Sequence, residues 1–215
     1  FSPRLASRWF AGAWGRGLLR LVPARLTIEG EKYLTRAPSF IVVSNHASLF
    51  DIPVLYGWLK LDLKWVMKKE LRKVPFIGTG CALMGHIFLD RSDREAAIGQ
   101  LKDAANKLQP GTSIIFFPEG TRKDPYDEPH YKIGIGEMYA NLNVPCVPIA
   151  LNSGMYWARR SFIKRPGTIK VEILPIIEPG LPRDEFMEVL QDRIETRALA
   201  LRAEAEEALG ISKPV

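Results

Sequence analysis

Cysteine and histidine are scarce in this 215-residue sequence, which contains two cysteines and three histidines. Cys81 and Cys146 are too few for a disulfide framework, and no spacing of Cys and His matches a metal site. The histidines, at positions 46, 86 and 130, likewise form no metal-ligand pattern. We therefore expect no metal, and two buried free thiols in a protein of a reducing compartment.

Long apolar runs are also missing, because no stretch approaches the roughly 20 residues that cross a bilayer as a helix. No secretory signal peptide is recognisable. The sequence begins at Phe1 rather than Met, so we regard it as compatible with a fragment that a membrane anchor precedes.

Acidic residues are outnumbered, and the net charge is +6. A basic balance suits anionic partners, which include membrane lipids, nucleic acids and phosphorylated substrates. The Lys and Arg residues are spread along the chain without a nucleic-acid-binding motif, so we expect no nucleic acid partner. No Gly-x-Ser-x-Gly segment is present either, which argues against an ordinary serine hydrolase.

Apolar segments that read as strands alternate with segments of helical periodicity. Strands are expected at 26–29, 40–44, 63–67, 87–89, 113–117, 146–151 and 168–177, and helices near 52–60, 92–108, 132–142 and 184–208. This alternation predicts an α/β layered fold with a mixed, largely parallel sheet flanked by helices. Because the connections are short, residues 25–215 are expected to form a single domain.

Residues 1–24 are set apart by an amphipathic pattern over 4–22. Arg4, Arg8, Arg16 and Arg20 recur at multiples of four beside a Trp/Phe/Leu face. That pattern is typical of a basic helix lying on an anionic membrane. The alternative is a surface helix packed on the domain core with solvated arginines, and the two can both be partly true.

The segment NHASLFD, residues 45–51, follows the expected buried strand at 40–44. His46 precedes Asp51 by five residues, and Pro53 favours a helix start there, which makes Asp51 a candidate N-cap. A carboxylate on one imidazole nitrogen fixes the tautomer and leaves the other nitrogen as a base. Such a base can deprotonate an alcohol near neutral pH.

Three further segments follow in order. GHIFLDR at 85–91 and FPEGTR at 117–122 each end a strand-like run with Arg, and VPIALN at 147–152 is a fourth strand-like run. With NHASLFD, these segments resemble the four motif blocks of the glycerolipid acyltransferases, most closely the 1-acyl-glycerol-3-phosphate branch. The resemblance covers roughly residues 25–180, and NHxxxxD in register with FPEGTR is highly specific.

The resemblance implies roles for individual residues. His46 would be the general base that takes the proton from a lysophospholipid hydroxyl, and Asp51 would orient it. The donor would be acyl-CoA or acyl-carrier protein, used as a co-substrate without any other cofactor. The phosphate end of the acceptor would meet Gly120, Thr121 and Arg122, with Arg91 and Lys68 beside them. Glu119 is unexpected next to a phosphate, and we expect it to pair with a cation or brace the loop. Asn45 would either hold its loop or polarise a ligand.

Taken together, these expectations describe an O-acyltransferase domain at 25–215, associated with a membrane that it meets from the cytoplasmic side. Its expected reaction acylates the sn-2 hydroxyl of lysophosphatidate to give phosphatidate in phospholipid biosynthesis. One alternative is the same chemistry on glycerol 3-phosphate or another lysophospholipid. The other is a peripheral membrane-binding module without catalysis, against which the intact His46 and Asp51 argue.

Overall fold

The computed structural model describes residues 12–20, 23–90, 92–106 and 110–211. Within them, seven strands form one sheet in the order β1-β7-β6-β2-β5-β3-β4. The strands are β1 (Ala24–Glu29), β2 (Ile41–Ser44), β3 (Asp62–Lys68), β4 (Ile87–Leu89), β5 (Thr112–Phe116), β6 (Cys146–Leu151) and β7 (Gly167–Ile173). All neighbouring pairs are parallel except β6 and β7, which are antiparallel. The predicted mixed, largely parallel sheet is confirmed.

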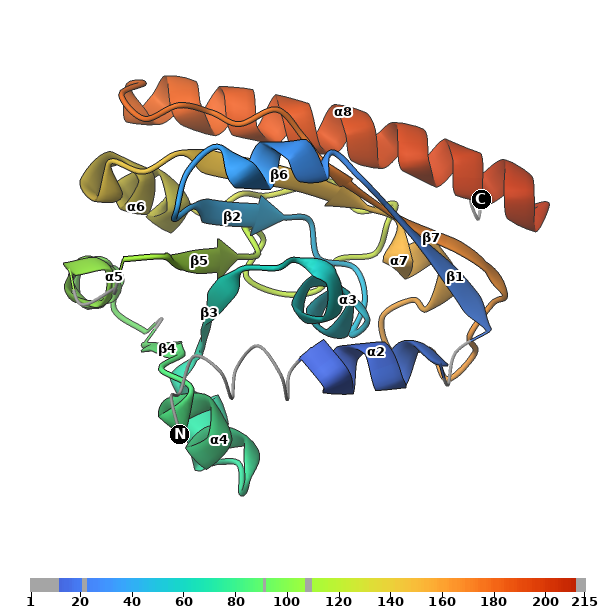
Figure 1. The fold of residues 1–215 in the computed structure, drawn as a ribbon, viewed down its shortest axis with the longest axis horizontal. Coiled ribbons are helices and arrows are strands. Elements are labelled where there is room, and N and C mark those ends of the chain that lie inside the picture. Colours follow the sequence, from blue (N-terminus) through green and yellow to red (C-terminus); the bar gives the residue numbers. More distant parts are fainter. Residues whose placement is uncertain (1–11, 21–22, 91, 107–109, 212–215) are drawn as a thin grey trace.

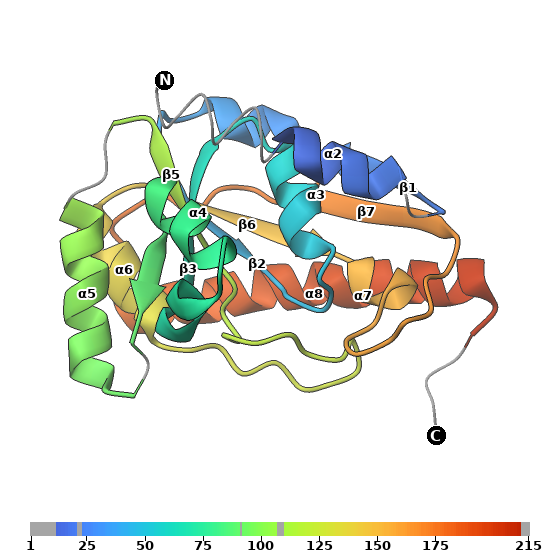
Figure 2. The ribbon, with the colours of Figure 1, turned by 90° about the horizontal axis from the view of Figure 1, so that it is seen from below.

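Helices cover both faces of this sheet, as Figure 1 shows. They are α2 (Gly12–Arg20), α3 (Asp51–Trp58), α4 (Ile77–Leu83), α5 (Arg94–Asn106), α6 (Gly134–Leu142), α7 (Ser153–Tyr156) and α8 (Arg183–Leu209), with short 3-10 segments η2 (Glu31–Thr35) and η3 (Lys69–Lys73). Helices α2 and α3 lie on one side and α8 on the other, seen again from below in Figure 2.

The central strand β2 explains why this arrangement forms. All four of its residues are buried, since a parallel strand in the middle of an α/β sheet is covered on both faces. Val42 packs into one apolar cluster with residues of α3, and Ile41 and Val43 pack into a second with residues of α6 and α8. The two clusters form the core on either side of the sheet.

Two sequence expectations are corrected. The strand predicted at 168–177 ends at Ile173, and only Ile177 beyond it pairs, through an isolated bridge to Cys146. Proline at 175 cannot donate to a strand ladder, which accounts for the break. The region between the strands predicted at 63–67 and 87–89, for which no helix is predicted, forms η3 and the helix α4.

The predicted amphipathic helix at 4–22 is described only from residue 12 onward, so Arg4 and Arg8 lie outside the described residues. From Gly12 to Arg20 the helix packs against α3. A Cβ on Gly15 would meet the Pro53 carbonyl oxygen at 2.3 Å, so glycine permits this close approach. Arg16 Nη1 donates to the Gly57 carbonyl at 3.0 Å, and Leu19 is buried in the core. Residues 12–20 therefore follow the alternative of a surface helix packed on the domain core. Trp14, which is 52% exposed, faces outward. Membrane binding by the segment stays a prediction.

The long helix α8 spans the predicted 184–208 segment and buries Phe186, Leu190 and Ile194. Across the described residues, no helix combines the length and the apolar character that crossing a membrane requires.

Candidate active site

Three parallel strands end at one edge of the sheet and gather the motif segments there. Strand β2 pairs with β5 on one side and with β6 on the other. NHASLFD therefore follows β2 directly beside FPEGTR, which follows β5, and beside Asn152 and Ser153, which follow β6. The carboxyl edge of a parallel sheet is the usual place for a site in an α/β fold.

His46 and Asp51 are joined by the predicted hydrogen bond, with His46 Nδ1 at 2.7 Å from Asp51 Oδ2. The Asp51 side chain is fully buried and also accepts from the backbone N–H groups of Ala47 and Ser48, both at 3.0 Å. The hydroxyl of Ser153 donates to its other oxygen, Oδ1. A carboxylate held in this way binds Nδ1–H of the imidazole and leaves Nε2 with the lone pair of a base.

The N-cap prediction for Asp51 is wrong. Phe50 occupies the N-cap position of α3, and Asp51 is the first helical residue with no capping hydrogen bond. Its carboxylate turns back to the loop that precedes the helix, because two backbone N–H groups of that loop and His46 all point at it. The same residue therefore closes the loop and orients the histidine.

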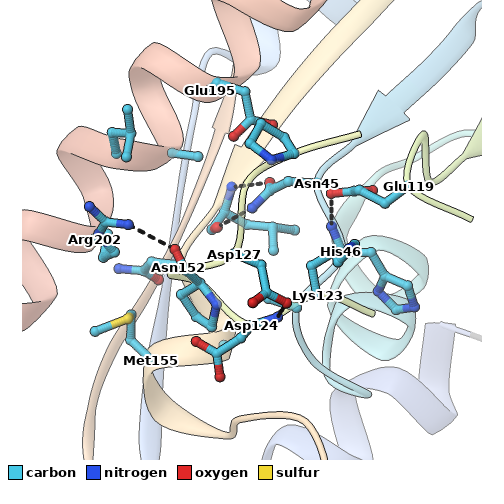
Figure 3. Close-up of a pocket in the computed structure, with 17 residues that line it drawn as sticks. Asn45, His46, Glu119, Lys123, Asp124, Asp127, Asn152, Met155, Glu195 and Arg202 are labelled. Carbon is cyan, nitrogen blue, oxygen red and sulfur yellow. Dashed lines mark hydrogen bonds between the residues drawn. The ribbon is translucent and has the colours of Figure 1, made fainter. Parts of the chain in front are cut away.

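The loop after β5 fixes His46 from the other side. The imidazole stacks on the Phe117 ring, with centroids 3.8 Å apart and an interplanar angle of 10°. The His46 N–H donates to Glu119 Oε1 at 3.1 Å, and its carbonyl accepts from the Lys123 N–H at 2.8 Å. Figure 3 shows Glu119 directed at the His46 backbone. Both backbone groups and one face of the ring are thus held.

Asn45 joins the loop to the neighbouring strand. Its Nδ2 donates to the Leu151 carbonyl and its Oδ1 accepts from the Leu151 N–H, both at 2.9 Å. These two bonds are drawn in Figure 3. Because both ends of the amide are engaged by backbone, the structure favours the loop-holding alternative over a contact with ligand.

Glu119 braces the loop, as one of the two sequence alternatives had it. The side chain is buried, and its Oε2 has no hydrogen-bond partner among the described residues. Burial raises the pKa of Glu119 to about 8, so the carboxyl is mostly neutral at pH 7. A neutral acid does not repel a phosphate, which removes the electrostatic objection to an acid in this motif.

A small polar pocket lies behind the His46 loop and is the one drawn in Figure 3. Its volume is about 60 Å³, and its lining includes Asn45, Glu119, Asn152, Glu195 and Arg202. It is too small for an acyl chain or a glycerophosphate. Within the described part of the chain, no group of three or more His, Cys, Asp or Glu side chains is arranged to hold a metal ion.

A much larger groove of about 750 Å³ opens on the other side of His46. Most of its lining is apolar, with walls from α2, α3, β3 and the region of α4, including Trp14, Ile52, Tyr56, Trp65, Met67, Leu71, Phe76, Ile77 and Met84. His46 and Phe117 line it, and so do Lys68, Gly120, Thr121 and Arg122. The groove thus brings an apolar wall, the base and two cations together.

Most of the predicted substrate-binding residues therefore line the same groove. Lys68 ends β3 at the groove, and Thr121 and Arg122 reach it from the loop after β5. Gly120 has φ of +70°, a left-handed conformation that favours glycine and shapes the turn before Thr121. Arg91 lies outside the described residues, so its role in binding the phosphate stays a prediction.

Sequence reasoning missed three features of the site. Ser153 donates to Asp51 from 102 residues away, and Phe117 stacks on His46. In the groove wall, His86 Nε2 lies 2.6 Å from the Tyr56 hydroxyl, and its Nδ1 accepts from the Trp65 N–H at 3.3 Å. Burial lowers the pKa of His86 to about 4, so this histidine is neutral and bridges Tyr56 and Trp65. The only available signal was position, since Phe117 is the last residue of the strand predicted at 113–117 and Ser153 comes two residues after the one predicted at 146–151.

Comparison with known proteins gives concordant matches. A family model described as Acyltransferase matches residues 25–152. A 1-acyl-sn-glycerol-3-phosphate acyltransferase of Pseudomonas aeruginosa is 35% identical over 152 residues, covering 70% of this chain and 58% of the relative. An enzyme of the same name from Cocos nucifera is 33% identical over 161 residues, covering 74% of this chain and 51% of the relative. The chain thus spans little more than half the length of these curated relatives.

Among solved structures, the chain is similar to the crystal structure of the 1-acyl-sn-glycerophosphate acyltransferase PlsC from Thermotoga maritima. The TM-score is 0.79 at 24% sequence identity, and the match covers 93% of this chain and 81% of the other. At that identity the likeness concerns the fold.

Proposed function

Because this chain belongs to the acyltransferase family, we propose that it transfers an acyl chain from acyl-CoA or acyl-carrier protein to the sn-2 hydroxyl of 1-acyl-glycerol-3-phosphate. The product would be phosphatidate, an intermediate of phospholipid biosynthesis. The observation that carries the proposal is the position of His46, which is paired with buried Asp51 and lines the apolar groove together with the cations Lys68 and Arg122.

In the proposed reaction, His46 Nε2 takes the proton from the acceptor hydroxyl as its oxygen attacks the thioester carbonyl. A C–O bond forms, the C–S bond breaks, and the proton goes on to the departing thiolate. Asp51 holds Nδ1 and stabilises the imidazolium that forms in between. No covalent enzyme intermediate is required, since the acceptor itself supplies the nucleophile. Holding both substrates beside His46 supplies the proximity that such a transfer needs.

The apolar wall of the groove suits an acyl chain, because burying each methylene contributes about 0.8 kcal/mol. Lys68 and Arg122 suit the phosphate of the acceptor. The guanidinium of Arg122 can form two parallel hydrogen bonds to phosphate oxygens, and Thr121 offers a hydroxyl beside it. A membrane surface rich in anionic lipid would present such an acceptor, and we propose that the protein works there, facing the cytoplasm.

The test of acceptor choice is thiol release from oleoyl-CoA with a panel of acceptors. The panel comprises lysophosphatidate, glycerol 3-phosphate and a lysophospholipid without a free phosphate monoester, and the lipid products are identified by mass spectrometry. Highest turnover with lysophosphatidate supports the proposal. Preference for glycerol 3-phosphate or another lysophospholipid would move the protein to the same chemistry on a different acceptor. No turnover with any acceptor would favour a non-catalytic membrane-binding module.

Arg122→Ala should weaken use of the phosphorylated acceptor and leave use of the donor nearly unchanged. A hydrogen bond to a charged group contributes roughly 1.5–3 kcal/mol, which corresponds to about 10- to 150-fold in acceptor kcat/KM. The apparent KM of each substrate is measured separately. Arg36→Ala, which removes an exposed arginine that is not among the groove-lining residues, serves as the control. Unaltered acceptor kinetics in Arg122→Ala would mean that the phosphate is bound elsewhere.

A further inference from the structure

The segment between α7 and β7 exposes two large apolar side chains that the proposed chemistry does not use. Phe162 is 96% exposed and Ile163 is 72% exposed. They lie next to each other in the 157–165 loop, which runs from Trp157 to Arg165. Exposed apolar side chains that lie together, unlike single scattered ones, indicate a surface that meets another molecule.

This loop is fixed by its own hydrogen bonds. Trp157 Nε1 donates to the Ser161 carbonyl at 2.7 Å, and the Ile163 N–H donates to Ser161 Oγ at 3.0 Å. The Arg165 N–H donates to the Tyr156 carbonyl at 2.8 Å, which closes the loop at its base. Arg160 adopts φ of +61°, an uncommon conformation for a residue with a side chain. These hydrogen bonds hold the loop in one conformation, in which Phe162 and Ile163 are exposed.

Positive charge surrounds the two apolar side chains. Arg159, Arg160, Lys164 and Arg165 are all exposed, and no Asp or Glu occurs in the sequence between Glu137 and Glu172. Lys164 Nζ lies 4.3 Å from the centre of the Trp157 ring, which holds that cation beside the apolar tip. Cations that flank a protruding aromatic residue match a surface with anionic headgroups over an apolar interior.

The loop also neighbours the catalytic segment. The ring of Trp157, at the start of the loop, lies 5.3 Å from that of Phe50 in NHASLFD, and Leu49 beside it is 50% exposed. Helix α8 forms the far side of the molecule from α2 and α3, as Figures 1 and 2 show together. The base of the loop therefore lies beside the segment that carries His46.

From these observations we infer that the 157–165 loop is a membrane anchor, which inserts Phe162 and Ile163 into the interfacial region of an anionic bilayer. The four cations meet the lipid phosphates around it. An acidic protein, such as a carrier protein, is the alternative occupant that the test distinguishes from a bilayer. The anchor lies within the described domain and is distinct from the basic segment at 4–22.

The test is co-sedimentation of the full chain with phosphatidylcholine vesicles, with and without phosphatidylglycerol, in the absence of acyl donor and acceptor. Its outcome does not depend on the acyl transfer proposed above. Phe162→Ser combined with Ile163→Ser should lower the vesicle partition coefficient roughly tenfold or more, since both side chains lose their apolar contact with lipid. Leu199→Ser is the matched control, because Leu199 is an exposed apolar residue on α8. Its partition coefficient should equal that of wild type.

A second pair of variants tests the charge. Arg159→Gln with Arg160→Gln should reduce binding to vesicles that contain phosphatidylglycerol, and the reduction should shrink as salt is added. Lys102→Gln, on the exposed surface of α5, is the control and should bind as wild type does.

Insertion itself is read from a fluorophore. Ile163→Cys in a Cys81→Ser background leaves only buried Cys146 as a second thiol, so an environment-sensitive label reports position 163. Anionic vesicles should shift its emission to the blue. Wild-type vesicle binding by the folded Phe162→Ser/Ile163→Ser variant, or an unshifted label, would overturn the inference. So would loss of carrier-protein binding by that variant with vesicle binding intact.

Discussion

At the scale of single residues, Asp51 links the histidine to the fold. Its carboxylate accepts from the His46 ring, from two backbone N–H groups and from the Ser153 hydroxyl, all in a fully buried position. A buried polar group is stable only where hydrogen bonds replace its water, so these partners stabilise the carboxylate in its buried position and fix its orientation. The orientation of His46 therefore depends on a residue far away in the sequence.

Ser153→Ala should for this reason destabilise the protein and lower turnover. Removing a hydrogen bond to a buried charged group is expected to cost about 1.5–3 kcal/mol in the free energy of unfolding. Denaturant unfolding measures the loss in the free energy of unfolding. The kcat should fall as well, because Asp51 then holds His46 less firmly. Ser92→Ala is matched in chemistry, since the Ser92 hydroxyl donates to the Asp90 carboxylate at 2.6 Å on the exposed surface. That control should lose little stability, and an equal loss in both variants would refute the role given to Ser153.

Because the pKa of Glu119 is raised in the folded protein, we expect the stability of the protein to depend on pH, and the direction of the shift gives the sign of this dependence. The pKa is about 8 in the folded protein against an ordinary 4.5, because burial disfavours the charged form. Between these two values the folded protein binds more protons than the unfolded chain, so the contribution of Glu119 to stability falls as pH rises through this window. Glu119→Gln stays neutral and keeps an oxygen that can accept the His46 N–H.

As pH is raised from about 5 to about 8, the free energy of unfolding of Glu119→Gln should therefore increase relative to that of wild type. Denaturant unfolding at a series of pH values measures the difference between the two proteins, in which other titrating groups largely cancel. A difference that stays constant across this window would show that Glu119 is ionised throughout. A difference that changes in the opposite direction would mean that the folded protein stabilises the charged form.

At the scale of elements, the contact between α2 and α3 determines how the N-terminal helix sits on the domain. Gly15 lies against the Pro53 carbonyl and the Gly57 N–H, with no room for a Cβ. Because α3 begins at Asp51, α2 supports the helix that carries the carboxylate bound to His46. Part of the apolar face predicted from the sequence therefore packs within the domain.

Gly15→Ala is expected to destabilise the fold by roughly 1–3 kcal/mol, as overpacking of a tight interface does. Gly17→Ala is the matched control on the same helix, since a Cβ there meets nothing within 4 Å. Alanine favours helix by up to about 1 kcal/mol over glycine, so this control should be neutral or stabilising. Thermal unfolding compares the two variants. Equal stability of the two would mean that α2 is not held against α3.

The strands were predictable because their signal is local. Runs such as the one at 40–44 are apolar and β-branched, and they are bounded by turn residues. The helix α4 was missed because its sequence, IGTGCAL, is rich in glycine, and in the structure Gly78 of this helix lies against the Arg72 backbone of η3. The short helix α7 carries no periodicity of its own. Such elements depend on tertiary contacts, which a local pattern does not contain.

At the scale of the whole molecule, the groove is the feature that one segment of sequence cannot predict. His46, Lys68 and Arg122 come from three segments, and parallel pairing of β2, β5 and β3 brings those segments together. The motif resemblance pointed to these residues and predicted a chemistry for each. It did not identify the apolar wall from α4, or Ser153 behind Asp51, since those depend on packing across the sheet.

If His46, held by Asp51, is the base for acyl transfer, its loss should abolish most thiol release from oleoyl-CoA with lysophosphatidate. We expect His46→Ala to fold as wild type does and to lose about 10²- to 10⁴-fold in turnover, the usual contribution of a positioned base. His130→Ala, which removes an exposed histidine outside the site, should keep wild-type turnover. Near-normal turnover in a well-folded His46→Ala protein would show that His46 is not the base.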